Sequence, residues 1–299
     1  MNWSGVFPAL TTKFDIHEAI DIQMYLKNLQ AQLDAGVHGI ILGGTLGESS
    51  TLTETEKEVL VKETLNYVGG TIPVILNIAE GSTKEAVRQA TLAQDWGAKG
   101  LMMLPPMRYK PDHRECVTYF KAVADHVNLP IMIYNNPVDY KTEVTLDMFE
   151  ELISCTNIQA IKESTRDISN VTRLANRFGD RLKILCGVDT LAMEELVMGA
   201  DGWVAGLVCA YPKETVTIFK LIQAGRIEEA RLIYRWFLPL LELDIHAKLV
   251  QYIKLAEFHE GIGTEYVRAP RLTLTGEERA AVEHIIKSSQ AKRPLLPTL

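Results

Sequence analysis

Eight short runs of apolar residues recur through the first 205 residues of the chain, and longer segments with helical periodicity lie between them. The runs are apolar along their whole length, which is typical of parallel strands buried on both faces. Thr53 with Glu56, and Ser82 with Glu85, resemble capping boxes that begin helices. Eight βα units favour a (β/α)8 TIM barrel over an open doubly wound sheet, and no GxGxxG follows the first run. The predicted strands span residues 6–10, 39–42, 74–77, 100–104, 130–134, 158–162, 182–186 and 202–205.

The chain continues beyond the length that a barrel needs. Residues 212–224 are predicted to form the eighth helix, so residues 1–224 are assigned to the barrel. Residues 225–299 are predicted to be a C-terminal helical extension, with helices around 228–243, 247–259 and 276–288. No linker rich in Pro, Gly or Ser precedes the extension, so we do not expect it to fold independently. We expect it to cover one side of the barrel or to form a subunit contact.

Charge and cysteine content narrow the class of protein. The chain carries 31 Lys and Arg against 38 Asp and Glu, a net charge of -7, which disfavours binding to nucleic acid or an anionic membrane. No apolar run is long enough to span a bilayer, and the first residues do not resemble a signal peptide. Cys116, Cys155, Cys186 and Cys209 show no zinc or disulfide spacing and are predicted to be core thiols in a reducing compartment. We therefore expect a cytoplasmic protein.

In a barrel of this class, reactive side chains lie at the carboxyl ends of the strands. Lys162 ends an apolar run there, where burial would favour the free amine that attacks a carbonyl carbon as a Schiff-base nucleophile. The alternative is that Lys162 forms a structural ion pair with Glu163 or extends to solvent at the rim of the barrel. Tyr134 ends another run and is a candidate for proton transfer, with a rim aromatic as its alternative.

A loop of glycines and hydroxyl residues follows the second predicted strand, at residues 43–50. Its backbone amides are candidates to hold a carboxylate or phosphate, although such loops are often only tight turns. Glu48 in this loop is a candidate for a catalytic acid or base. The alternative is a carboxylate in the first turn of a helix, where the helix dipole favours it. The seven histidines show no HxH or HExxH spacing, so no metal site is expected.

Four segments of the sequence together carry a family resemblance. In chain order they are GVFPALTT at 5–12, GTLGE at 44–48, YNNP at 134–137 and IKES at 161–164. They resemble the dihydrodipicolinate synthase / N-acetylneuraminate lyase family of Schiff-base lyases and aldolases. The resemblance implies a (β/α)8 barrel with a C-terminal helical extension, no cofactor, a small-molecule 2-oxo acid substrate of the pyruvate type, and a homotetramer built as a dimer of dimers.

The resemblance also implies roles for individual residues. Lys162 matches the Schiff-base lysine, and Tyr134 matches the tyrosine that transfers protons. Thr45 matches a hydroxyl residue that binds the 2-oxo acid carboxylate together with loop amides, here those of Gly44 and Leu46. Val204 matches a residue whose backbone carbonyl faces the bound 2-oxo acid.

Three positions depart from the synthase pattern. Leu46 replaces a second hydroxyl residue, Asp139 stands where an arginine binds the dicarboxylic substrate, and Met107 stands where a tyrosine completes the proton relay of a neighbouring subunit. Tyr109, two residues further on, is the candidate to replace that tyrosine. These departures favour a catabolic aldolase, dehydratase or deaminase that acts on 4-hydroxy-2-oxoglutarate, a 2-keto-3-deoxy sugar acid or 4-hydroxy-pyrroline-2-carboxylate.

Three alternatives stay open at the level of the sequence. One is 4-hydroxy-tetrahydrodipicolinate synthase of lysine biosynthesis. Another is a non-catalytic protein that binds 2-oxo acids on the same barrel. The third is a metal-dependent aldolase.

Overall fold

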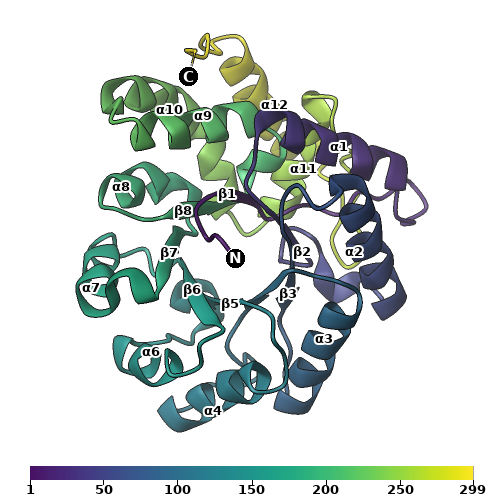
Figure 1. Ribbon diagram of the computed structural model, residues 1–299. Helices are drawn as coiled ribbons and strands as arrows, with labels where there is room; N and C mark the ends of the chain where they lie inside the picture. Colours follow the sequence, from purple (N-terminus) through teal and green to yellow (C-terminus); the bar gives the residue numbers. More distant parts are fainter. Residues whose placement is uncertain (299) are drawn as a thin grey trace.

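The computed structural model describes residues 1–298, and its centre is a closed barrel of eight parallel strands surrounded by helices (Figure 1). The pairing order is β1-β8-β7-β6-β5-β4-β3-β2, and the bridge between Ala9 and Ile41 joins the two remaining edges. The predicted (β/α)8 barrel is therefore confirmed. The strands are β1 (Gly5–Pro8), β2 (Ile40–Leu42), β3 (Val74–Ile78), β4 (Gly100–Met103), β5 (Ile131–Asn135), β6 (Ile158–Glu163), β7 (Lys183–Cys186) and β8 (Gly202–Ala205).

The strands agree with the predicted runs to within two residues at either end. Almost every strand residue is buried, and the exceptions are the partly exposed Tyr134, Gln159 and Lys183. This burial on both faces follows from helices outside the barrel and packed side chains inside it. The uninterrupted apolar character of the runs was thus a sound indicator of parallel strands.

The helices follow the predicted order, with one addition after β5. The short helix α5 was not expected, because its four residues are too few to show helical periodicity. The helices are α1 (Ile22–Ala35), α2 (Glu54–Val68), α3 (Thr83–Asp95), α4 (His113–Ala124), α5 (Pro137–Tyr140), α6 (Leu146–Leu152), α7 (Ser169–Phe178), α8 (Ala192–Val197), α9 (Pro212–Gln223), α10 (Ile227–Leu241), α11 (Leu249–His259) and α12 (Gly276–Gln290).

One of the two predicted capping boxes is complete. Thr53 accepts a hydrogen bond from the backbone N–H of Glu56, whose carboxylate accepts from the backbone of Thr53. Ser82 accepts from the backbone N–H of Glu85, but the carboxylate of Glu85 pairs with Arg88 instead. The prediction of the second capping box is therefore wrong for the hydrogen bond from the Ser82 backbone to the Glu85 carboxylate. The Arg88 guanidinium is a stronger partner for Glu85 than a backbone amide.

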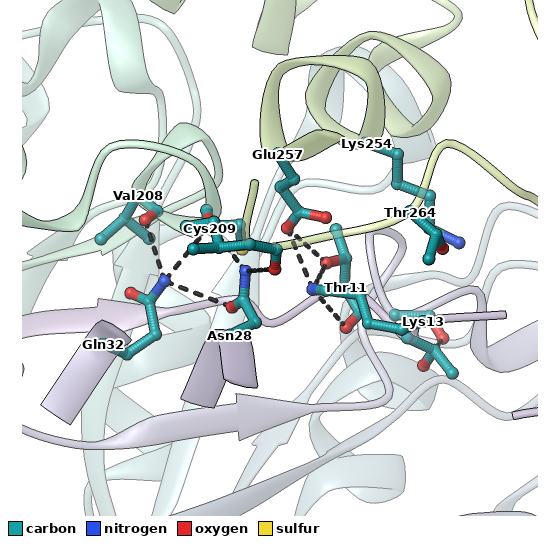
Figure 2. A network of polar contacts seen from close by, with 12 residues as sticks. Thr11, Lys13, Asn28, Gln32, Val208, Cys209, Lys254, Glu257 and Thr264 are labelled. Atoms are coloured by element: carbon teal, nitrogen blue, oxygen red, sulfur yellow. Dashed lines mark hydrogen bonds and ion pairs between the residues drawn. The ribbon is translucent and has the colours of Figure 1, made fainter. Parts of the chain in front are cut away.

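The C-terminal extension is attached to the barrel through buried charges (Figure 2). On α11, Glu257 accepts from Thr11 at 2.6 Å and from the ammonium of Lys13 at 3.1 Å, and the Lys13 and Glu257 side chains are both fully buried. Lys254, one turn away on α11, pairs with the buried carboxylate of Glu48 at 2.5 Å. Breaking one partner of such a pair leaves a buried charge uncompensated. The extension is therefore tied to the loops that follow β1 and β2, and Glu48 is one of its anchors.

All four cysteines are free thiols, and Cys116, Cys186 and Cys209 are buried. Cys155, in the turn between α6 and β6, is only partly buried and packs against the edge of the core. Of the helices in residues 1–298, none combines the length and the apolar character needed to cross a bilayer.

Candidate active site

A pocket opens at the carboxyl ends of the strands. Six of the seven predicted site residues line it, from four different strand ends: Gly44, Thr45, Leu46, Tyr134, Lys162 and Val204. The barrel brings them together because all eight parallel strands end on the same face. Tyr109 does not line the pocket of its own chain and is 56% exposed.

Lys162 lies in the wall of this pocket near the end of β6 and is only 7% exposed. It does not pair with Glu163, whose carboxylate accepts hydrogen bonds from the backbone of Thr165 and from Asn170. Gly187 leaves space for the lysine, since a Cβ there would lie 2.6 Å from Lys162 Cγ. Burial lowers the pKa of Lys162, and the nearby carboxylate of Asp244 acts in the opposite direction. A buried lysine with a lowered pKa has a larger fraction of the nucleophilic free amine.

Two tyrosines stand between Lys162 and the glycine-rich loop. Tyr134 is the register partner of Lys162 in the adjacent strand, and the Lys162 Nζ lies 4.0 Å from the centroid of its ring. Tyr140 packs edge-on against Tyr134 and shares a hydrogen bond of 2.7 Å with the hydroxyl of Thr45. Burial raises the pKa of both phenols to about 12. The hydroxyls therefore stay protonated at neutral pH and are able to act as hydrogen-bond donors.

Two carboxylates also line the pocket, and their surroundings differ. Asp139 accepts from Asn136 at 2.8 Å and lies 3.6 Å from the guanidinium of Arg166. Asp244 comes from the 3₁₀ turn Glu242–Ile245 of the extension, and burial raises the pKa of its carboxyl well above the ordinary value. The wall formed by these residues therefore presents acidic groups beside the lysine.

A further buried aspartate, Asp189, supports the backbone at one edge of the pocket. The carboxylate of Asp189 accepts from the indole of Trp203 and from the backbone N–H groups of Gly206 and Leu207. These bonds fix the turn after β8, where Gly206 faces the pocket next to the strand that carries Val204. Asp189 therefore holds the backbone beside the site in place.

Sequence analysis missed Asp244 and the contact between Tyr140 and Thr45. Asp244 follows no strand, so the rule that reactive groups lie at strand ends gave no signal for it. Tyr140 lies in the short helix α5, six residues after Tyr134, and only the three-dimensional arrangement brings its hydroxyl to the loop after β2. Within residues 1–298, no three His, Cys, Asp or Glu side chains gather in an arrangement that could hold a metal ion.

Comparisons with known proteins agree with this architecture. Residues 2–289 match the model of the dihydrodipicolinate synthetase family. The chain is 30% identical over 289 residues to a 4-hydroxy-tetrahydrodipicolinate synthase of Exiguobacterium sibiricum, covering 97% of this chain and 98% of the relative. A dihydrodipicolinate synthase structure from Bacillus anthracis superposes with a TM-score of 0.92 at 28% identity, covering 96% and 99% of the two chains.

A monomeric dihydrodipicolinate synthase variant is also similar in structure, with a TM-score of 0.91, 25% identity and 97% of each chain covered. The match to the family model extends from the first strand to the last helix of the extension. This protein is therefore an enzyme that belongs to the dihydrodipicolinate synthetase family of Schiff-base-forming lyases.

Proposed function

We propose that the pocket binds a pyruvate-type 2-oxo acid and that Lys162 is the residue that forms the Schiff base. The observation that carries this proposal is a lysine that is 7% exposed, has a lowered pKa and has no salt bridge within residues 1–298, at a strand end of a barrel from a Schiff-base lyase family. The neutral amine attacks C2 of the 2-oxo acid, and the carbinolamine loses water to give an iminium. The iminium accepts electrons when C3 loses a proton or a carbon fragment.

We assign proton transfer to Tyr134. Its hydroxyl accepts a hydrogen bond from Asn136 at 3.1 Å, and the Nζ of Lys162 lies 4.0 Å from the centre of its ring. A phenol in this position is able to give a proton to the departing hydroxide of the carbinolamine and to take a proton from C3. Tyr140, which packs edge-on against Tyr134, shares a hydrogen bond with Thr45 in the loop after β2.

The carboxylate of the 2-oxo acid is assigned to the loop after β2. Thr45 supplies a hydroxyl, and Gly44 and Leu46 supply backbone groups at the wall of the pocket. The buried side chain of Leu46 has no hydrogen-bonding group, so the backbone carries more of this contact. Val204 also lines the pocket, and its backbone carbonyl is assigned to face the 2-oxo acid.

The names of the relatives support 4-hydroxy-tetrahydrodipicolinate synthase as the reaction of this pocket more directly than they support a catabolic lyase. The synthase reaction is therefore the first candidate for the step that follows iminium formation. The proteins in this comparison are enzymes, which favours catalysis over a non-catalytic binding function.

A catabolic lyase is the second candidate, and one specific observation favours it. Asp139 lines the pocket and would repel a second carboxylate of the substrate. Arg166, at 3.6 Å from Asp139, is partly neutralised by that aspartate. Cleavage or deamination of 4-hydroxy-2-oxoglutarate, a 2-keto-3-deoxy sugar acid or 4-hydroxy-pyrroline-2-carboxylate would use the same iminium.

Two measurements test these proposals. Borohydride trapping with pyruvate, followed by peptide mapping, should give a stable adduct on Lys162; an unmodified Lys162 would overturn the proposed nucleophile. Pyruvate consumption with aspartate semialdehyde is then compared with pyruvate or ammonia release from the three catabolic substrates. The substrate with the highest kcat/KM decides between the two candidates.

A homotetramer and a cytoplasmic location remain predictions from the family resemblance and the composition. The similar monomeric variant makes the oligomeric state worth measuring directly by sedimentation. The assignment of Tyr109 to a neighbouring subunit's pocket depends on that result, since Tyr109 lies outside the pocket of its own chain.

A further inference from the structure

Asp244 enters the active-site pocket from outside the barrel. It belongs to the 3₁₀ turn between α10 and α11, and its neighbour Ile245 and the first residue of α11, Leu249, also line the pocket. The extension therefore forms part of the pocket wall as well as packing against the barrel. This position brings to the pocket a carboxylate that no strand end supplies.

The barrel has a gap that admits this carboxylate. A Cβ on Gly206 would lie 2.2 Å from Asp244 Oδ1 and 3.0 Å from Leu46 Cδ1. Gly206 does not have a positive φ angle, so its backbone does not itself require glycine. The absence of a side chain at this position is therefore explained by the approach of the Asp244 carboxylate.

Asp244 differs from the other acids near the pocket because no residue in 1–298 donates a hydrogen bond to it or forms an ion pair with it. Asp139 has Asn136 and Arg166, and Asp189 has three donors. Removing a carboxylate from water without a donor is costly, so an unpartnered carboxylate in a pocket favours a ligand that donates hydrogen bonds.

The part of the substrate that reaches Asp244 follows from the proposed function, on which this inference rests. C2 must lie at Lys162, and the 2-oxo acid carboxylate is assigned to the loop at Gly44–Leu46. The chain beyond C3 is left to face the remaining polar wall, which includes Asp139, Tyr140 and Asp244.

We propose that Asp244 is a specificity-determining residue, which recognises a hydroxyl or ammonium group carried by the substrate beyond C3. A second carboxylate at the same place would lie near the Asp139 carboxylate, which also lines this wall. The C-terminal extension thereby selects the substrate, while the barrel supplies the chemistry.

Three five-carbon 2-oxo acids test this proposal, because they differ only at C5 and none carries the C4 hydroxyl needed for aldol cleavage. 2-Oxopentanoate ends in a methyl group, 5-hydroxy-2-oxopentanoate in a hydroxyl, and 2-oxoglutarate in a carboxylate. The readout is the concentration that gives half-maximal borohydride trapping on Lys162. For the wild type we expect this concentration to be about tenfold lower for the hydroxylated acid than for 2-oxopentanoate, and highest for 2-oxoglutarate.

The Asp244→Asn variant should lose most of this ordering when each half-maximal concentration is expressed relative to that of pyruvate in the same variant, since removing the carboxylate also changes the pKa of Lys162. Glu242→Gln removes an exposed carboxylate from the same turn and serves as the matched control, which should keep the wild-type ordering. Equal loss of pyruvate and hydroxylated-acid trapping in Asp244→Asn would mean that Asp244 acts on the iminium, and it would overturn the proposal. An unchanged ordering would also overturn it. Failure of pyruvate to trap on wild-type Lys162 would instead overturn the proposed function.

Discussion

The Nζ of Lys162 lies 4.0 Å from the centre of the Tyr134 ring, and the two residues are register partners on adjacent strands. Parallel strands in register place such side chains next to each other on the same face, so the nucleophile and the proposed proton donor are held by the sheet itself. Neither position depends on a flexible loop. This rigidity is what a reaction with several proton transfers at one carbon requires.

Replacing Lys162 and Tyr134 should separate the two proposed roles. Lys162→Ala should abolish borohydride trapping with pyruvate, because the nucleophile is gone. Tyr134→Phe should retain trapping and lower turnover by about 10²- to 10⁴-fold, the usual contribution of general acid–base catalysis. Intact mass and steady-state kinetics measure the two effects. Trapping in Lys162→Ala would contradict the assignment of the nucleophile.

The rate of trapping should depend on pH in a defined direction. Burial lowers the pKa of Lys162 from its ordinary value of 10.5, and only the neutral amine attacks the carbonyl carbon. The initial trapping rate with pyruvate should therefore rise with pH and level off at a pH below 10.5. A rate that still rises steeply beyond that pH would show that the lysine titrates like an exposed one.

Filling the gap at Gly206 should reproduce the loss of Asp244. A Cβ at this position overlaps the Asp244 carboxylate, so Gly206→Ala should displace it and weaken the preference for a hydroxyl at C5. The same trapping series measures the effect. Because both changes act on one contact, the double variant with Asp244→Asn should be no worse than the more affected single variant. Additive losses would indicate that Gly206→Ala damages the pocket in another way.

Stability should fall with rising pH because of Glu195. Its side chain is fully buried, both carboxylate oxygens lack hydrogen-bond partners within residues 1–298, and burial raises its pKa to about 8 from 4.5. Between these values the folded state holds a proton that the unfolded state has released. The free energy of unfolding should then decrease with pH, by up to about 1.4 kcal/mol per pH unit.

The Glu195→Gln variant isolates this contribution. Its amide does not titrate, so the stability difference between variant and wild type should shift in favour of the variant as pH rises from 5 towards about 8. Urea unfolding at a series of pH values measures this difference. A difference that stays constant across the series would contradict the raised pKa.

The buried pair between Lys13 and Glu257 should matter more than any exposed pair. Lys13→Met leaves the buried Glu257 without its cation and should destabilise the fold by about 3–5 kcal/mol. Lys62→Met removes an exposed pair with Glu58 on α2 and should cost less than about 1 kcal/mol. Similar losses in the two variants would show that the extension is not held through this buried contact.

The rule that reactive residues lie at the carboxyl ends of barrel strands was sufficient to find Lys162 and Tyr134 from the sequence. Both end apolar runs, and in a barrel with parallel strands the ends of such runs converge on one face. The structure confirms that the two residues line one pocket. Their catalytic roles remain proposals that the experiments above will test.

The same rule gave no signal for residues that reach the pocket from outside the strands. Glu48 looked equally like a catalytic acid and a helix-start carboxylate, and the structure places it in a buried pair with Lys254, 206 residues further along the chain. Tyr140 and Asp244 likewise acquire their positions from a short helix and from the extension.

The amino-acid sequence by itself determined the barrel, the number and order of its strands, and the face on which its chemistry lies, because hydrophobic periodicity is a local property that can be counted along the chain. Only the tertiary structure decided which charges are paired and which are left free. Asp244 and Glu48 are the same kind of group in the sequence, yet Glu48 meets the ammonium of Lys254 and Asp244 faces an open pocket without a donor. Pairing of this kind depends on contacts between segments distant in the chain, and no local pattern records them.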